Sequence, residues 1–143
     1  MSSSVETLAV HSADLTAPNL ADIERLADAA FAQLPETFKT LCGDVIVHVV
    51  DFPDEETLRE MEAESEFELL GLFRGQGLAQ RPAAPESGAP PNMIWLYRRP
   101  LLDFWCEGDD TLGAVVTHVL VHEIGHHFGL SDDDIEAIEA ATA

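Results

Sequence analysis

The sequence from Thr111 to Phe128 reads TLGAVVTHVLVHEIGHHF. Apolar residues fill most positions of this stretch, which predicts one long helix that is apolar on most of its faces. Other elements must cover such a helix, so we expect it to be buried at the centre of the fold. Gly129 follows it directly and is a good helix stop, since glycine readily adopts the left-handed conformation that ends many helices.

Two histidines within this helix, His122 and His126, are four residues apart. That spacing puts both imidazoles on one face, about one turn apart, where they can bind a single metal ion. Glu123 lies on an adjacent line of the helix, where it can take a proton from a water on zinc and pass it to a departing amine. Unpaired histidines and a glutamate would be costly to bury in so apolar a helix. The pattern therefore predicts a Zn²⁺ site with Glu123 as general base.

A catalytic zinc needs a third protein ligand and an open fourth position. Gly129 can take a positive φ, so the chain can turn sharply and return toward the metal within a few residues. Asp132 is the first carboxylate after that turn, and the run that ends there reads H-E-x-x-H-x-x-G-x-x-D. Asp133 and Asp134 remain alternatives, either as the ligand or as hydrogen-bond partners of the histidines.

Three further histidines need an interpretation. His127 points about 100° away from His126, so we expect it to be packed or hydrogen-bonded rather than a ligand. His118 lies one turn before His122; it could line the cleft, but we expect a surface or core histidine. His48 lies in a β-branched run and is expected to be structural.

The rest of the chain predicts an α+β fold, with a small mixed β-sheet packed against the helices. We expect strands at 45–50, 67–75 and 93–98, the first of them buried on both faces. Further helices are predicted at 20–34 and 54–61, at 100–106 as a short helix or turn, and after the Ser131 cap. Residues 1–17 are expected to be a flexible leader, 18–143 a single domain, and 75–92 a surface loop.

The chain carries 27 acidic and 7 basic residues among 143, a formal net charge of −20. This charge would repel a phosphate backbone, so we expect no nucleic-acid partner; it would suit basic substrates or partners. Cys42 and Cys106 match neither a disulfide framework nor a metal-binding spacing, which indicates reduced thiols in a cytoplasmic protein. We expect no signal peptide, no membrane association and a monomer.

The run from His122 to Leu130 resembles the signature of the small bacterial zincin-like metallopeptidases, the minimal zincins, with their HExxHxxGxxD motif. Residues 34–38, 70–75 and 94–100 are similar more loosely. The resemblance implies a compact zincin-like fold in which a C-terminal helix follows the active-site helix. It also implies that His122, His126 and Asp132 are the zinc ligands and that Glu123 is the catalytic base. A peptide or protein substrate could add as an extra strand beside residues 69–74.

Three functions are considered for these observations. The first is a zinc metallopeptidase, a hydrolase in which Glu123 deprotonates the attacking water. The alternative is a non-catalytic zinc-binding protein-interaction module, in which a fourth side chain such as Asp133, Asp134 or His118 closes the metal site. Metal storage or sensing is a third reading, and it would require weak, exchangeable binding of several divalent ions.

The sequence identifies no definite side chain to stabilise the oxyanion of the tetrahedral intermediate that forms in peptide hydrolysis. Tyr97, Arg98 or Arg99 could serve if the third predicted strand ends near the zinc. The chain is also short beside the larger zincins, which leaves little of it to build specificity pockets.

Overall fold

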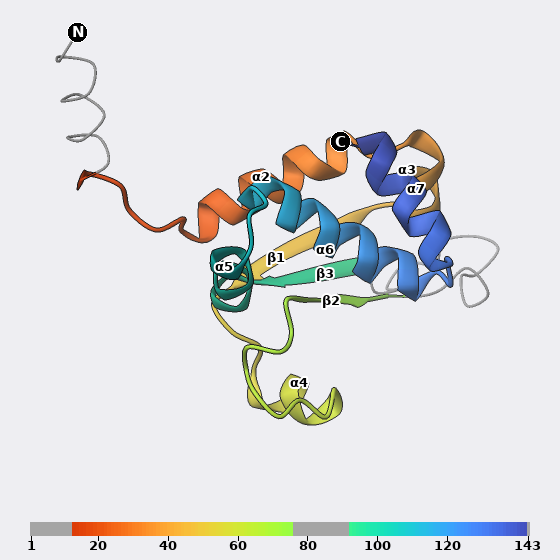
Figure 1. The fold of residues 1–143 in the computed structure, drawn as a ribbon. Helices are drawn as coiled ribbons and strands as arrows, with labels where there is room; N and C mark the ends of the chain where they lie inside the picture. Colours follow the sequence, from red (N-terminus) through yellow and green to blue (C-terminus); the bar gives the residue numbers. More distant parts are fainter. Residues whose placement is uncertain (1–12, 76–91, 143) are drawn as a thin grey trace, which may run out of the picture.

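The computed structural model describes residues 13–75 and 92–142. Three strands form one mixed sheet in the order β1-β3-β2 (Figure 1). β1 (Val45–Val50) pairs in parallel with the central β3 (Asn92–Tyr97), and β2 (Gly71–Arg74) pairs with β3 in the antiparallel direction. The sheet therefore has β1 at one edge and β2 at the other.

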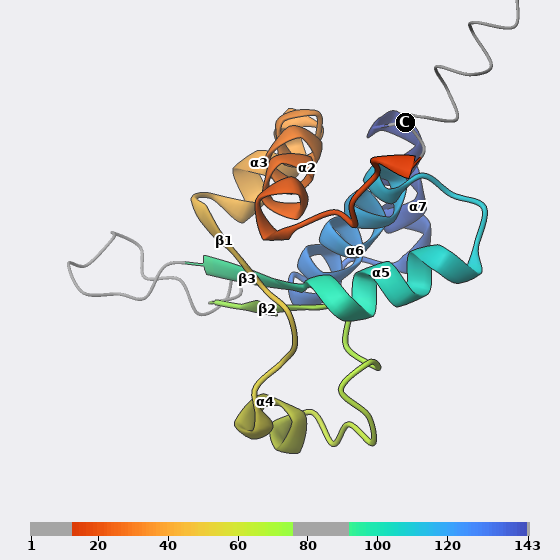
Figure 2. The same cartoon turned by 90° about the vertical axis from the view of Figure 1, so that its left-hand side faces the viewer.

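Most of the helices lie against one face of this sheet. α2 (Leu20–Ala32) contacts β1, and α6 (Leu112–His127) lies beside α2 and contacts β2 and β3 (Figure 2). α7 (Asp132–Thr142) packs on α6, α3 (Glu36–Cys42) follows α2, and α5 (Arg98–Glu107) leads from the end of β3 toward α6. α4 (Glu55–Glu60) lies apart from the other helices, on the opposite side of the sheet. This arrangement confirms the predicted α+β class.

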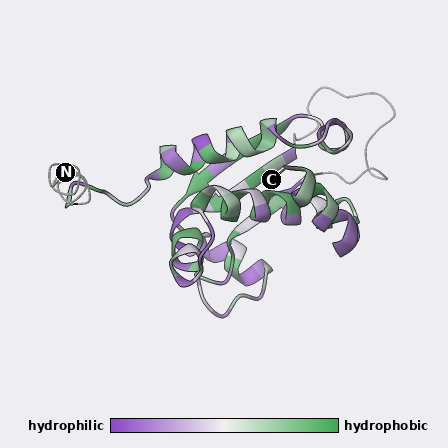
Figure 3. Cartoon of the chain, turned by 45° about the horizontal axis from the view of Figure 1, so that its top comes forward, coloured by the Kyte–Doolittle hydropathy of each residue, from purple (hydrophilic) through white to green (hydrophobic). Residues whose placement is uncertain are grey.

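The core is built around α6. Its fully buried side chains include Val116, Leu120 and Ile124, which pack with Ile94 of β3 and Ile23 of α2. In Figure 3 hydrophobic colouring predominates along α6, whereas α2 alternates between hydrophilic and hydrophobic residues, as a helix with one buried side must. The central, buried position predicted for the helix at 111–128 is thus confirmed.

The turn between α6 and α7 follows from local backbone chemistry. Gly129 has a φ of +77°, a conformation that favours glycine, so the helix ends there. The Leu130 N–H donates to the Gly125 carbonyl at 2.9 Å and the Gly129 N–H to the His126 carbonyl at 3.1 Å, the pair of bonds that defines a Schellman cap. The chain then reverses at once, which brings α7 back along α6.

Several predictions about single elements need correction. β1 is not buried on both faces: among the described residues it is an edge strand with helices on one side only, and Ile46 is 45% exposed. β2 is shorter than predicted, and α3 was not predicted at all. Arg98 begins α5 instead of ending the third strand.

Other expectations fall partly outside the described residues. These include most of the predicted leader, at 1–12, and most of the predicted loop, at 76–91. Cys42 is buried and Cys106 is exposed. Across the part of the chain that the structure describes, no helix combines the length and apolar character needed to cross a bilayer.

Candidate metal centre

Three histidines form a stripe along α6. His118, His122 and His126 follow one another at intervals of one helical turn, so their rings lie on the same side of the helix. The ring centroids of His118 and His122 are 4.1 Å apart, and those of His122 and His126 are 5.3 Å apart. The side chain of His122 is the least exposed of the three, at 33%. The structure thus brings the predicted histidine pair together and adds a third ring to it.

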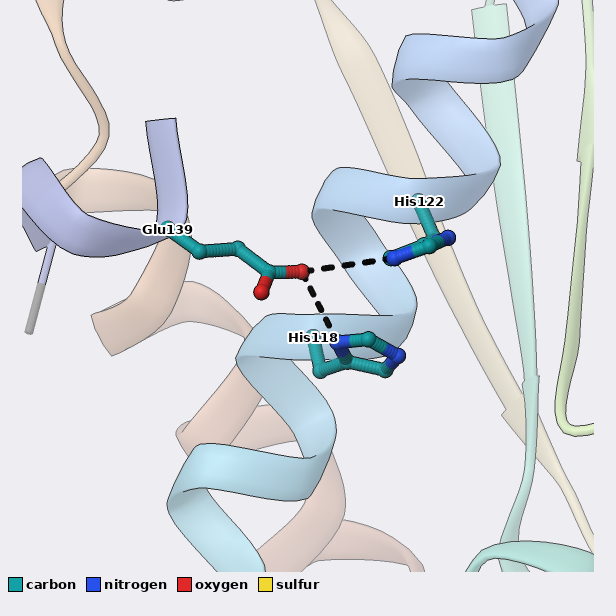
Figure 4. Close-up of side chains that lie close together, drawn as sticks. All are labelled: His118, His122 and Glu139. Atoms are coloured by element: carbon teal, nitrogen blue, oxygen red, sulfur yellow. Dashed lines mark ion pairs between the residues drawn. The ribbon is translucent and has the colours of Figure 1, made fainter. Parts of the chain in front are cut away.

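A carboxylate from α7 faces this stripe. Oε1 of Glu139 lies 2.8 Å from Nδ1 of His118 and 3.6 Å from Nε2 of His122 (Figure 4). The oxygen is buried, yet neither contact has hydrogen-bond geometry, so the short separation from His118 does not satisfy it. A buried acceptor in that condition is costly unless a cation or proton lies beside it. Glu139 is the residue that the sequence interpretation missed.

The three aspartates at the start of α7 take different positions. Oδ1 of Asp132 lies 4.0 Å from Nε2 of His126, and its side chain is 84% exposed. Asp134 is engaged in capping the helix: its N–H donates to Oγ of Ser131, and its carboxylate accepts from the Ser131 N–H. Among these three aspartates, the structure brings Asp132 nearest to the histidine stripe, and Asp134 serves α7 itself.

Glu123 lies on the other side of the stripe, toward β2. It lines a cavity of about 220 Å³ together with His118, His122 and residues 68–71, which lead into β2. Burial raises the pKa of the Glu123 carboxyl above its ordinary value, while His126 opposes the shift. A half-buried carboxylate with a raised pKa is a better proton acceptor than an exposed one.

The electrostatics of His122 favour a neutral ring. Burial lowers its pKa most, the neighbouring His118 lowers it further, and Glu139 opposes both effects. A neutral imidazole has a free nitrogen lone pair, which is the form that binds a metal ion. The local environment therefore holds His122 in the state that a ligand needs.

These residues fit a zinc ion. Imidazole nitrogens and carboxylate oxygens are ordinary zinc ligands, and adjacent ligand atoms of a tetrahedral site lie about 3.3 Å apart. The distances from Glu139 to the two histidines, 2.8 and 3.6 Å, lie on either side of that value. The ligand atoms of His118, His122 and Glu139 all lie within 4.8 Å of one another. The unsatisfied buried oxygen of Glu139 supports the same conclusion.

The expectations for the other histidines agree with the structure. His127 packs its ring against Phe73 at 4.5 Å between centroids, as expected for a packed histidine. His48 stacks on Trp95 at 4.3 Å, a structural role. His118 is a surface histidine, as expected, with its side chain 48% exposed, and it also lines the cavity beside His122.

The residues considered for the oxyanion are engaged elsewhere. Arg98 pairs with Asp51 at 3.0 Å, and the guanidinium of Arg99 lies over the ring of Phe52. Tyr97 is buried and lines a separate cavity of about 480 Å³, next to α4. None of these side chains lines the cavity that holds Glu123.

The sequence contains one feature that points to Glu139 once the fold is known. It lies seven residues after Asp132, which places both carboxylates on the same side of α7, two turns apart. Ile135 lies between them and is fully buried against α6. Once α7 is known to run back along α6, a carboxylate in that position must lie near the histidine stripe.

The sequence profile of the zincin-like metallopeptidase family matches residues 42–142. The chain belongs to the zincin-like metallopeptidase family. The match extends over the whole sheet, α6, the Gly129 turn and α7, so it includes the histidine stripe and both facing carboxylates. No functionally curated protein shows significant similarity to the chain. Membership in this family confirms the resemblance and implies zinc binding and peptidase activity at the level of the family.

Proposed function

We propose that this zincin-like protein is a zinc-dependent peptidase with Glu123 as its general base. The observation that carries the proposal is the placement of Glu123. Its carboxylate lines the cavity between the histidine stripe and β2, and it follows His122 directly in the chain. Its raised pKa suits a group that must accept a proton and release it again.

His122 and His126 would hold the zinc, with Asp132 as the third ligand. The family profile covers all three, and Asp132 approaches His126 across the glycine turn. A bound zinc would polarise the peptide carbonyl and lower the pKa of a water molecule to about 7. Glu123 would take the proton of that water and then deliver it to the leaving amine, so one carboxylate serves both halves of the reaction.

β2 supplies a place for the substrate. Within residues 13–75 and 92–142 it forms an edge of the sheet and pairs with β3 on one side only. An extended peptide could therefore bind along its other side through backbone hydrogen bonds, close to the cavity that holds Glu123. The net charge of −20 would favour peptides that carry lysine or arginine.

The test replaces the base without removing a ligand. Zinc-loaded wild type and Glu123→Gln should be incubated with a broad peptide library, and the products identified by mass spectrometry. We expect Glu123→Gln to retain its zinc and to lose activity by a factor of about 10²–10⁴. Glu24→Gln, an exposed glutamate on α2, is the matched control and should cleave like the wild type.

A second function has one specific observation in its favour. Glu139 and His118 approach His122 closely enough to complete a closed metal site, which would suit a non-catalytic protein-interaction module. X-ray absorption of the zinc-loaded protein distinguishes the two. A water ligand supports the peptidase, whereas four protein ligands and no cleavage of the library would contradict it.

A further inference from the structure

Two carboxylates of α7 face the histidine stripe at two different positions along α6. Asp132 lies near His126, at the end of α6, and Glu139 lies between His118 and His122, one to two turns earlier. Glu139 is the closer carboxylate: its oxygen lies 2.8 and 3.6 Å from histidine nitrogens, whereas the oxygen of Asp132 lies 4.0 Å from one. Glu139 is also the more buried carboxylate, at 27% exposure against 84%.

We propose that His118, His122 and Glu139 form a second position for a divalent transition-metal ion. This position shares His122 with the predicted site at His126 and Asp132. Three ligand atoms that all lie within 4.8 Å of one another, drawn from two helices packed side by side, can converge on one ion. Two nitrogens and one carboxylate oxygen select zinc, cobalt, nickel or copper over magnesium and calcium, which prefer oxygen ligands.

The alternative explanation for this trio is a simple ion pair between Glu139 and a protonated His118. A hydrogen-bonded pair does not account for the trio, because Oε1 of Glu139 is buried and accepts no hydrogen bond despite its short distance from Nδ1 of His118. Two imidazole nitrogens lie beside one buried carboxylate oxygen. A cation that accepts a lone pair from each of these three atoms matches the arrangement better.

Sharing His122 makes the two positions competitive. In the structure, Nε2 of His122 is the nitrogen that faces Glu139. A neutral imidazole offers one lone pair, so His122 cannot ligate two ions at once in this form. An ion bound by His118, His122 and Glu139 would leave His126 and Asp132 without a metal. The second position would then hold the ion about one turn of α6 away from the predicted site at His126 and Asp132.

The test measures zinc binding alone, so it is independent of peptide hydrolysis. Zinc affinity should be determined by competition with a chromophoric chelator in two backgrounds, His126→Ala and His118→Ala. Each background weakens one position and leaves the other with all its ligands. Glu139→Gln and Asp132→Asn are then added to each background in turn, and circular dichroism confirms that every variant folds.

We expect a crossed pattern. In the His126→Ala background, Glu139→Gln should weaken zinc binding at least tenfold, whereas Asp132→Asn should change it less than threefold. In the His118→Ala background the order should reverse. The proposal is overturned if Glu139→Gln has no effect in the His126→Ala background, or if Asp132→Asn dominates in both backgrounds. Should His126→Ala fail to fold, His126→Gln provides the same comparison with a side chain of similar length.

Failure of this proposal can be told apart from failure of the proposed function. The loss of hydrolysis in Glu123→Gln tests the reaction, and neither outcome there alters the zinc affinities compared here. Conversely, a chain that binds zinc in the crossed pattern but cleaves no peptide would retain the second position and lose the peptidase assignment.

Discussion

The histidine stripe of α6 is flanked by two elements that are built differently, β2 on one side and α7 on the other, which we call its two walls. The β2 wall is part of the sheet, and its strand is held by the backbone ladder to β3. Gly71 lies so close to α6 that an added Cβ would meet Val119 at 2.9 Å. The α7 wall is a single helix that packs on α6 through Ile135, which lies against Gly125. Glu123 faces the first wall, while Asp132 and Glu139 belong to the second.

The difference separates the two tasks of the site. A general base must stay at a fixed distance from the reacting water. Glu123 lies beside β2, a strand that hydrogen bonds hold in register with β3. Metal ligands can adjust to the ion, and the two candidate carboxylates lie on a helix that packs on α6 through the fully buried Ile135, with Ile138 partly buried against the core. We therefore expect changes in the α7 packing to affect zinc binding, and changes in the β2 packing to affect mainly stability.

The largest expected effect comes from the anchor of the α7 wall. Ile135 is fully buried, so Ile135→Ala should reduce the free energy of unfolding by about 2–5 kcal/mol, through lost burial and the cavity left behind. Zinc affinity should fall as well, because Asp132 and Glu139 flank this residue on α7. Urea denaturation and chelator competition measure the two quantities. Ile46→Ala, at an exposed position of the edge strand, is the control and should have a much smaller effect.

An Ile135→Ala protein that loses stability but keeps its zinc affinity unchanged would contradict the proposed difference between the walls. It would mean that α7 is positioned by its Ser131 cap and the Gly129 turn, and not by the packing of Ile135. The same outcome would leave the ligand assignments intact, since those depend on side chains that the variant retains.

A smaller effect is expected at the two glycines where β2 and α7 pack closely on α6, Gly71 and Gly125. At Gly71 an added Cβ would lie 3.0 Å from the backbone carbonyl of Trp95, which cannot rotate away. We expect Gly71→Ala to cost about 1–3 kcal/mol. At Gly125 the Cβ would meet side-chain atoms of Ile135 at 2.8 and 3.0 Å, and alanine gains up to about 1 kcal/mol of helix propensity there. Gly125→Ala should therefore cost less, but should shift α7 and weaken zinc binding.

Gly113→Ala provides a control on the same helix. The nearest atom to an added Cβ at Gly113 is a Leu26 methyl at 3.8 Å, an ordinary contact. This variant should be neutral or stabilising by up to about 1 kcal/mol. Equal losses of stability for Gly71→Ala and Gly125→Ala, with no change of zinc affinity in either, would remove the distinction between a rigid and an adjustable wall.

The sequence predicts the candidate ligands unequally, for a physical reason. The motif lies within one helix and one turn, so the positions of His122, His126 and Asp132 follow from helical periodicity and a glycine with positive φ. Glu139 becomes relevant only after the chain reverses at Gly129 and α7 lies along α6. That is a tertiary relation, and no periodicity within α7 alone can reveal it.

The same limit explains the error at β1. Its β-branched run predicted a strand buried on both faces, as in a sheet covered by helices on each side. In the part of the chain that the structure describes, helices cover one face of β1 and no strand pairs with its outer side, because β3, the third strand in sequence, occupies the centre. Strand order depends on which segments pair, and residue composition does not determine it.

The smallest effect concerns a buried hydroxyl behind the β2 wall. Tyr97 ends β3, and burial raises the pKa of its phenol to about 12, while Arg74 opposes the shift. The folded-state pKa lies above the ordinary value of 10.0, so the folded chain holds the proton more tightly than the unfolded chain does. The resulting stability is complete below pH 10 and is lost progressively as the pH rises toward about 12.

Tyr97→Phe removes this titration. Relative to the variant, the wild type should lose about 1 kcal/mol of unfolding free energy by pH 11, as measured by urea denaturation at a series of pH values. Tyr97 is the only tyrosine in the sequence, so phenolate absorbance reports its pKa directly. A pKa near ten in that titration would show that water reaches the phenol behind β2. Burial at this end of β3 would then be less complete than the structure indicates.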